Sequence, residues 1–156
     1  MSQLTDAALV VAQTQIGEKE NPLGSNWGHP VQDYLASVDV HFAASWCMAF
    51  LYWCFDHAAG QLGQANPLFK TGGVLAQWRN RKANQVPVGA AVLPGDIFVM
   101  DLGSGLGHTG IVESIDADGT LHTIEGNTND NGSREGIEVE RKIRHKAKPI
   151  IGYLRF

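Results

Sequence analysis

Four residues of this chain have the side chains that a thiol-based acyl-transfer site requires. Cys47 begins a strongly apolar segment, His108 lies in the sequence Gly-His-Thr-Gly-Ile-Val, and Glu125 stands two positions before Asn127. Such a site needs a nucleophile, a base that takes the proton of the nucleophile, and a third group that orients the base. We therefore predict Cys47 as the nucleophile, His108 as the base and Glu125 as the orienting group.

The position of Cys47 within its segment favours a reactive thiol. Residues 46–59 are apolar nearly all round, which predicts a helix enclosed by other elements. Ser45 is the expected N-cap and Gly60 the expected C-terminal stop, which places Cys47 in the first turn. The unsatisfied amides of a first helical turn stabilise a thiolate.

The second cysteine, Cys54, is expected to be structural. It lies seven residues after Cys47 on the same predicted helix, about 10 Å further along the axis. The field of the helix end has faded there, and the separation exceeds disulfide reach. Both cysteines are therefore expected to be free thiols.

Among the six histidines, His108 is the best candidate for the base. Its neighbouring glycines leave room beside the ring, and the strand that follows is apolar. His57 lies at the far end of the cysteine helix, whereas His122 is the real competitor. The other histidines stand in loop-like or charged surroundings, and they are His29, His41 and His145.

The turn at residues 116–119 predicts that Glu125 comes close to His108. This turn joins two apolar strands, so the end of one strand and the beginning of the other can be neighbours across a hairpin. Asn127 has the same strand parity as Glu125, and we expect it to be a second polar support or to bind substrate. The hairpin thus supplies both the orienting group and an auxiliary residue.

The remaining pattern predicts helices followed by strands, which is the α+β class with an antiparallel sheet. Helices are expected at residues 4–16, 31–38, 46–59 and 74–81, and strands at 97–100, 110–115, 120–125, 137–143 and 150–156. We expect the central cysteine helix to pack on the C-terminal sheet. No repeat or low-complexity linker interrupts the chain, so residues 1–156 are expected to form a single catalytic domain.

Composition and charge exclude several other classes of protein. The net charge of −4 and the absence of a basic stripe exclude a nucleic-acid interface. The basic stretch at residues 141–146 is interpreted as the outer face of an edge strand. Neither a signal peptide nor a transmembrane segment is visible, so we expect synthesis in the cytoplasm, and we expect a monomer.

No metal or other cofactor is expected. Residues 127–132 followed by Glu138 nearly match a calcium-binding loop, but the first position is Asn and the flanking segments favour strands over helices. No pair of Cys or His residues has zinc-ligand spacing in a loop or hairpin. An Asn- and Gly-rich turn accounts for the segment.

Taken together, these motifs resemble the CHAP family, the cysteine- and histidine-dependent amidohydrolases and peptidases. The resembling segments are residues 16–20 with Asn26, 34–35, 45–50 with Trp53, 94–97, 107–112 and 124–128. The resemblance implies a papain-like fold, with Cys47, His108 and Glu125 as catalytic residues and with Asn127 and Trp46 as auxiliary or substrate-binding residues. Some members carry an acidic calcium loop before the cysteine, but residues 37–42 contain a single acid here, so calcium dependence is not expected.

The resemblance further implies hydrolysis of an amide bond in bacterial peptidoglycan through a thioester, by an amidase or an endopeptidase. We then expect action in the periplasm or cell wall after delivery, either as an antibacterial effector with a cognate immunity protein or as a phage lysis enzyme. Two alternatives stay open. One is a catalytically silent module that binds peptides or a partner, and the other is a thiol enzyme of the transglutaminase or deamidase type that acts on proteins.

Overall fold

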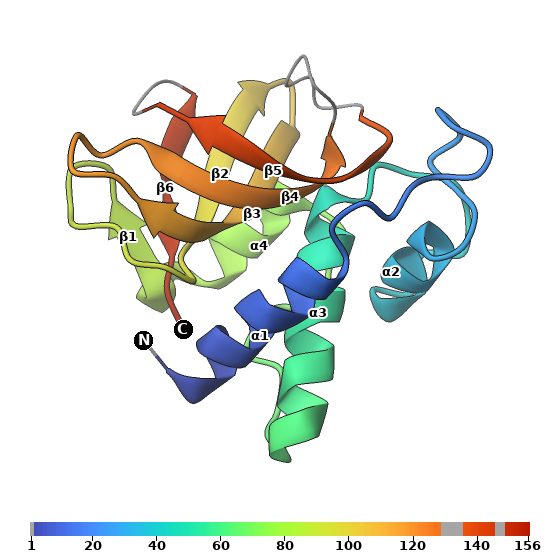
Figure 1. The fold of residues 1–156 in the computed structure, drawn as a ribbon, viewed down its shortest axis with the longest axis horizontal. Helices are drawn as coiled ribbons and strands as arrows, with labels where there is room; N and C mark the ends of the chain where they lie inside the picture. The colour runs from blue at the N-terminus through green and yellow to red at the C-terminus, as the bar shows by residue number, and fades with distance from the viewer. Residues whose placement is uncertain (1, 129–135, 146–148) are drawn as a thin grey trace.

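Helices come first along the chain and one antiparallel sheet follows, in a computed structural model that describes residues 2–128, 136–145 and 149–156 (Figure 1). The helices are α1 (Gln3–Thr14), α2 (Val31–Ser37), α3 (Cys47–Leu62) and α4 (Val74–Asn80), with a 3-10 turn at Lys82–Asn84. The strands are β1 (Gln85–Pro87), β2 (Ile97–Gly103), β3 (Leu106–Ile115), β4 (Leu121–Thr128), β5 (Glu138–Arg144) and β6 (Ile150–Leu154). The predicted α+β class is confirmed.

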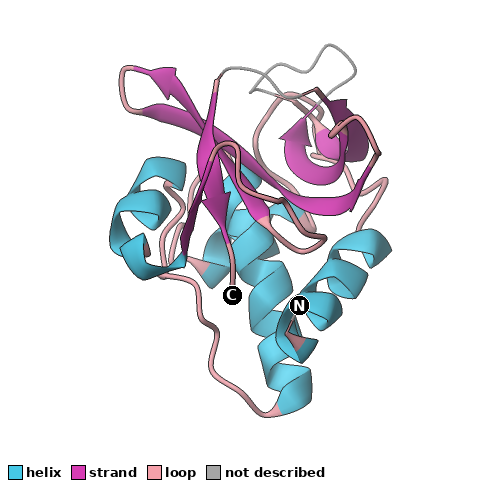
Figure 2. Ribbon diagram, turned by 90° about the vertical axis from the view of Figure 1, so that its left-hand side faces the viewer, coloured by secondary structure: helices cyan, strands magenta, loops and turns pink. Residues whose placement is uncertain are grey.

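The sheet has the strand order β1-β6-β2-β3-β4-β5, and all its pairs are antiparallel. Its strands curl strongly, and most of the helical part of the molecule lies below the sheet in the view of Figure 2. The hairpin predicted at residues 116–119 joins β3 to β4, and Ile111 stands opposite Ile124. This register places the beginning of β3 beside the end of β4, where the candidate residues lie.

Apolar side chains pack on both faces of the sheet. The larger cluster joins the helices to one sheet face and includes Ile97 and Val99 of β2. The residues between and after them, Phe98 and Met100, belong to a second cluster with Tyr153 on the opposite face. This alternation follows from the two-residue period of a strand. The second face is therefore not simply exposed to water, and polar groups can be buried there.

Helix α3 begins with the cysteine, as predicted, but its caps differ from the prediction. Trp46 is the N-cap and makes no side-chain capping bond, so Ser45 does not cap the helix. The helix also continues past Gly60 to Leu62 and ends at Gly63, whose φ of 64° lies in the left-handed region. Gly63 therefore supplies the conformation that terminates this helix.

Other boundaries shift for similar local reasons. Helix α1 ends at Thr14, two residues before the predicted end, and Gly17 with φ 93° lies in the segment beyond it. Strand β1 was not predicted, because its three residues include a proline. It pairs with β6 through Gln85 and Leu154, at the edge of the sheet where a proline is tolerated.

The far edge strand, β5, is partly covered by the segment that follows α1. The amide of Gly17 donates to Val139 O, and the amide of Val139 donates to Glu18 O, each at 2.9 Å. The predicted outer face of residues 141–146 is correct for Arg141, whose side chain is 59% exposed, but wrong for Arg144, whose side chain is 18% exposed. The residues from 146 to 148 lie outside the described part of the chain.

In the described residues, no helix combines the length and apolar character needed to cross a membrane. The same residues contain no group of three or more His, Cys, Asp or Glu side chains placed to hold a metal ion. The stretch considered above as a calcium loop falls largely in residues 129–135, which lie outside the described part of the chain.

Candidate active site

Cys47 is the first residue of α3, and its side chain is buried, with 3% of the residue exposed. The first intrahelical bond of this turn runs from the amide of Phe50 to Trp46 O at 2.9 Å. The amides before Phe50 have no partner further back in the helix, so they form the positive end of the helix dipole. The sulfur therefore sits where a negative charge is stabilised.

Cys54 provides a contrast within the same helix. It is completely buried, and burial raises the pKa of its thiol well above the ordinary value. Both cysteines are free thiols, as predicted. The two thiols therefore differ in surroundings, and Cys47 alone of the two lies at a helix end.

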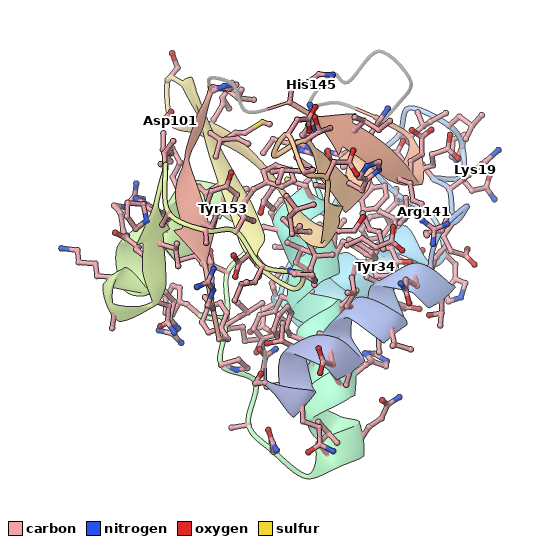
Figure 3. All side chains as sticks on the ribbon, turned by 60° about the vertical axis from the view of Figure 1, so that its left-hand side comes forward. Lys19, Tyr34, Asp101, Arg141, His145 and Tyr153 are labelled. Atoms are coloured by element: carbon pink, nitrogen blue, oxygen red, sulfur yellow. The ribbon has the colours of Figure 1, made fainter. Side chains whose placement is uncertain are left out.

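The residue before Cys47 fixes the start of the helix. The Trp46 side chain is fully buried, and its Nε1 donates to Glu20 Oε1 at 2.9 Å. Its ring centroid lies 5.7 Å from that of Tyr34, which Figure 3 labels among the helices. Trp46, which the sequence predicts as an auxiliary or substrate-binding residue, thus lies inside the protein directly before Cys47. We place Trp46 in the packing that supports Cys47.

Gly126 allows α3 to approach β4 closely. A Cβ atom at this position would lie 2.8 Å from Trp46 Cζ3 and 3.0 Å from Phe50 Cβ. Real side chains do not approach so closely, so any larger residue would push the start of α3 away from β4. The glycine between Glu125 and Asn127 is thus what brings the cysteine helix against the strand that carries them.

His108 lies near the beginning of β3 and is 2% exposed. Its Nε2 donates to Glu125 Oε1 at 2.7 Å, which confirms the predicted proximity of the two residues. The donor must be the ring nitrogen, because an ionised carboxylate only accepts. Nδ1 is then the ring nitrogen that remains for the thiol.

The Cys47 thiol lies close to His108 but does not complete a hydrogen bond. Nδ1 has no hydrogen-bond partner among the described residues. The sulfur is nevertheless near enough to act on the titration of the ring. Burial lowers the pKa of His108, but the proximity of Cys47 and the hydrogen bond and charge of Glu125 outweigh burial and raise the pKa to about 9. Loose contacts of this kind are common in catalytic sites without substrate.

Glu125 is fully buried and accepts four hydrogen bonds. Oε1 accepts from His108 and from Arg144 Nη2, the latter at 2.5 Å. Oε2 accepts from Thr123 Oγ1 at 2.6 Å and from Arg144 Nε at 2.8 Å. Burial raises the pKa of this carboxyl, but Arg144 and His108 lower it more, to about 2. Glu125 is therefore a carboxylate at neutral pH.

The space for this carboxylate comes from a glycine on the neighbouring strand. A Cβ at position 110 would lie 2.6 Å from Glu125 Cγ and 2.7 Å from Phe98 Cε1. Gly110, which the sequence predicts to leave room beside the ring of His108, therefore makes room for the Glu125 side chain. It lets the Glu125 side chain cross β3 toward that ring.

Asn127 is fully buried with φ 55°, a left-handed conformation that is uncommon for residues other than glycine. Neither polar atom of its side chain has a hydrogen-bond partner in the part of the chain that the structure describes. A buried amide without a partner is costly, so such groups cluster where a substrate or water can complete them. The sequence placed Asn127 beside Glu125 but did not reveal this unusual backbone.

His122 is not part of this group. Its Nε2 contacts Asp116 Oδ2 at 2.9 Å near the β3–β4 turn, and its side chain is 35% exposed. The register explains the separation, because His122 stands opposite Ser114 at the far end of the hairpin. His108 is therefore the histidine that the fold brings to Cys47.

Sequence reasoning missed Arg144, Thr123 and the role of Glu20. Thr123 shares strand parity with Glu125, which is a signal that was available. In β5, Glu140, Lys142 and Arg144 stand opposite Glu125, Thr123 and Leu121 in the register, and so on the same face. The alternation of charged residues in β5 indicates that these three share one face. Arg144 was nevertheless interpreted as solvent-exposed, because basic residues are typical of the outer face of an edge strand.

A helix-borne cysteine beside a sheet-borne histidine and its carboxylate places this chain among α+β proteins of known fold. The solved structure of the wild-type endolysin LysIME-EF1 matches 99% of the chain with a TM-score of 0.56 and 19% sequence identity. The chain covers 64% of the length of that endolysin. At this identity the likeness shows the fold. Comparison with curated proteins gives no significant match.

The model of the CHAP domain family matches residues 39–127, which is more than half of the chain. This chain therefore belongs to the CHAP domain family. The matched region contains Cys47, His108, Glu125 and Asn127. Glu20 and Arg144 lie outside it.

The buried charges predict how stability depends on pH. Glu125 has a pKa of about 2 against an ordinary 4.5, so its contribution is present above about pH 4.5 and is lost as the pH falls through 2. His108 has a pKa of about 9 against an ordinary 6.5, so its contribution is complete below about pH 6.5 and is lost as the pH rises through 9.

We therefore expect the free energy of unfolding, relative to a Glu125→Gln, His108→Gln double variant, to be largest between about pH 4.5 and 6.5 and to decline on both sides. Urea unfolding at a series of pH values measures it. A difference that stays constant from about pH 3 to 9 would show that these groups are not paired as described.

Proposed function

We propose that this chain is a cysteine-dependent peptidoglycan hydrolase that cleaves an amide bond of the cell-wall peptide. The observation that carries the proposal is the line of contacts from the Cys47 thiol through the His108 ring to the Glu125 carboxylate. Membership of the CHAP domain family and the endolysin-like fold support the choice of peptidoglycan as the substrate.

The first chemical step is acylation of Cys47. With a pKa of about 9, His108 is an imidazolium at neutral pH and supplies the charge opposite to the attacking thiolate. The sulfur forms a bond to the carbonyl carbon, and the first-turn amides of α3 point toward the developing oxyanion. The carbon–nitrogen bond then breaks as His108 Nδ1 donates its proton to the leaving amine.

The second step is hydrolysis of the thioester. His108, now neutral, takes a proton from a water molecule whose oxygen bonds to the thioester carbon. The carbon–sulfur bond breaks, a carboxylic acid leaves, and the thiolate and imidazolium are regenerated. Glu125 holds Nε2 throughout, so the ring presents Nδ1 to both steps. Asn127 is the auxiliary polar group available to the substrate.

Incubation with purified sacculi tests the activity. We expect the wild-type chain to release soluble fragments, and we expect Cys47→Ala to lose more than about a thousandfold of this rate, because removal of the nucleophile disables the whole unit. Cys54→Ala is the matched control, since it removes a thiol from the same helix. It is expected to cost stability but to leave the chemistry intact.

Mass spectrometry of the fragments then locates the bond. A cut between glycan and stem defines an amidase, and a cut within the stem or cross-link defines an endopeptidase. If the wild type and Cys47→Ala release the same amount, or if neither releases fragments, the hydrolase proposal is wrong. In that case a binding module, or a thiol enzyme that acts on proteins, becomes the better account.

Peptidoglycan lies outside the cytoplasm, so we propose that the protein acts in the periplasm or cell wall. Expression with an added export signal is expected to lyse a susceptible bacterium, whereas the same chain kept in the cytoplasm is expected to be harmless. Optical density after induction is the measurement, and exported Cys47→Ala is the control. Killing by the cytoplasmic form alone would contradict this site of action.

A further inference from the structure

Arg144 makes both of its described hydrogen bonds to one carboxylate, that of Glu125. Nη2 donates to Oε1 at 2.5 Å and Nε donates to Oε2 at 2.8 Å, so the two planar groups meet in a two-pronged pair. The guanidinium carbon lies 5.9 Å from the centroid of the Phe98 ring. Charge-assisted pairs of this kind fix orientation as well as supplying energy.

Arg144 reaches Glu125 from a different position along the paired strands. Arg144 stands opposite Leu121 in the register, four positions along β4 from Glu125. Its side chain must therefore run back along the strand, over Phe98, to reach the carboxylate. An exposed basic residue at the end of an edge strand would normally extend into water, where its entropy is greater.

We propose that Arg144 is a positioning residue, which acts through Glu125 to fix the rotation and the charge of the group that orients His108. This inference rests on the function proposed above, and it concerns a residue outside the region matched by the family model. Arg144 touches neither the sulfur nor a reacting atom, so it does not itself perform a chemical step.

The geometric part of this role follows from how the hydrogen-bond donors are shared between the two carboxylate oxygens of Glu125. Oε1 is shared by His108 and Arg144, whereas Oε2 is held by Thr123 and the second prong of Arg144. Without Arg144, Glu125 keeps one partner on each oxygen and can rotate away from the ring. A lysine offers one point charge and cannot bind both oxygens in a fixed plane.

The electrostatic part comes from the charges that surround Glu125. His108 faces it from β3 with Cys47 behind the ring, and Glu140 of β5 stands opposite it in the register. Lys142 of β5 is paired with Glu140 at 3.0 Å. Arg144 is a permanent cation in direct contact with Glu125, and its loss leaves a buried carboxylate near a second acid.

The chain offers a matched control on the same strand. Arg141 forms an equivalent two-pronged pair with Glu113, through Nε at 2.8 Å and Nη2 at 2.9 Å. Its side chain is 59% exposed, and Figure 3 shows Arg141 toward the outside of the molecule, on the side of Lys19. Arg141→Gln thus breaks an arginine–carboxylate pair of the same geometry away from His108.

The experiment follows the His108 ring by NMR through a pH titration in four forms of the full chain: wild type, Arg144→Gln, Arg144→Lys and Arg141→Gln. The signal is assigned by its disappearance in His108→Gln. The rate of fragment release from sacculi is measured over the same pH range. Thermal unfolding of each form reports general damage to the fold.

We expect Arg144→Gln to move the titration of His108 upward by about one pH unit, because a neighbouring cation is removed. The pKa of Glu125, which the signal of the same ring reports, should also rise by about 1–3 pH units. The acid limb of the activity profile should follow it, with at least a tenfold loss below its new midpoint. Arg144→Lys should keep the acid limb near that of the wild type, and Arg141→Gln should leave both profiles unchanged.

The inference is overturned if Arg144→Gln and Arg141→Gln give the same His108 titration and the same activity profile as the wild type, whatever their thermal stabilities. If Arg144→Gln does not fold, Arg144→Lys is the deciding variant. It should keep the acid limb of the activity profile but lower the maximal rate at least tenfold. An unchanged maximal rate in Arg144→Lys would overturn the inference. Wild-type protein without activity on sacculi would contradict the proposed function, while the NMR titration still tests the link from Arg144 to His108.

Discussion

The buried carboxylate of Glu125 is the constraint on which the geometry of the candidate active site depends. Glu125 is fully buried, and an unpaired charge in such a place would be too costly to persist. Its four hydrogen bonds come from β3, β4 and β5, so three strands must hold a fixed relation for the charge to be tolerated. The orientation of His108 is one consequence of satisfying this charge.

Close approaches at two glycines complete the arrangement. The glycine at position 110 leaves room for the Glu125 side chain, and Gly126 leaves room for Trp46 and Phe50. The first brings the carboxylate to the imidazole, and the second brings the beginning of α3 to the sheet. Glu20, which is itself buried, accepts a hydrogen bond from Trp46 Nε1. Cys47 follows Trp46, so the contacts that hold Trp46 also set the position of Cys47.

The sequence predicted the parts that depend on local pattern. Apolar periodicity located the cysteine helix, and the turn at residues 116–119 placed Glu125 beside His108, because a hairpin fixes its own register. The end of α3 was wrong because Gly60 and Gly63 offer similar stop signals and the fold uses the later one. Arg144 was missed because it stands opposite Leu121 in the register, four positions along β4 from its partner Glu125. The twist and curl of a sheet bring together residues that strand parity does not relate.

The central claim is that the sulfur of Cys47 and the ring of His108 act as one unit, and alkylation of the folded protein by iodoacetamide tests it most directly. Mass spectrometry over time gives the rate at each cysteine at neutral pH. The account predicts that Cys47 is modified at least about tenfold faster than Cys54 and that His108→Ala slows Cys47 by a similar factor. Equal rates at the two cysteines, or a Cys47 rate unaffected by loss of the ring, would contradict it.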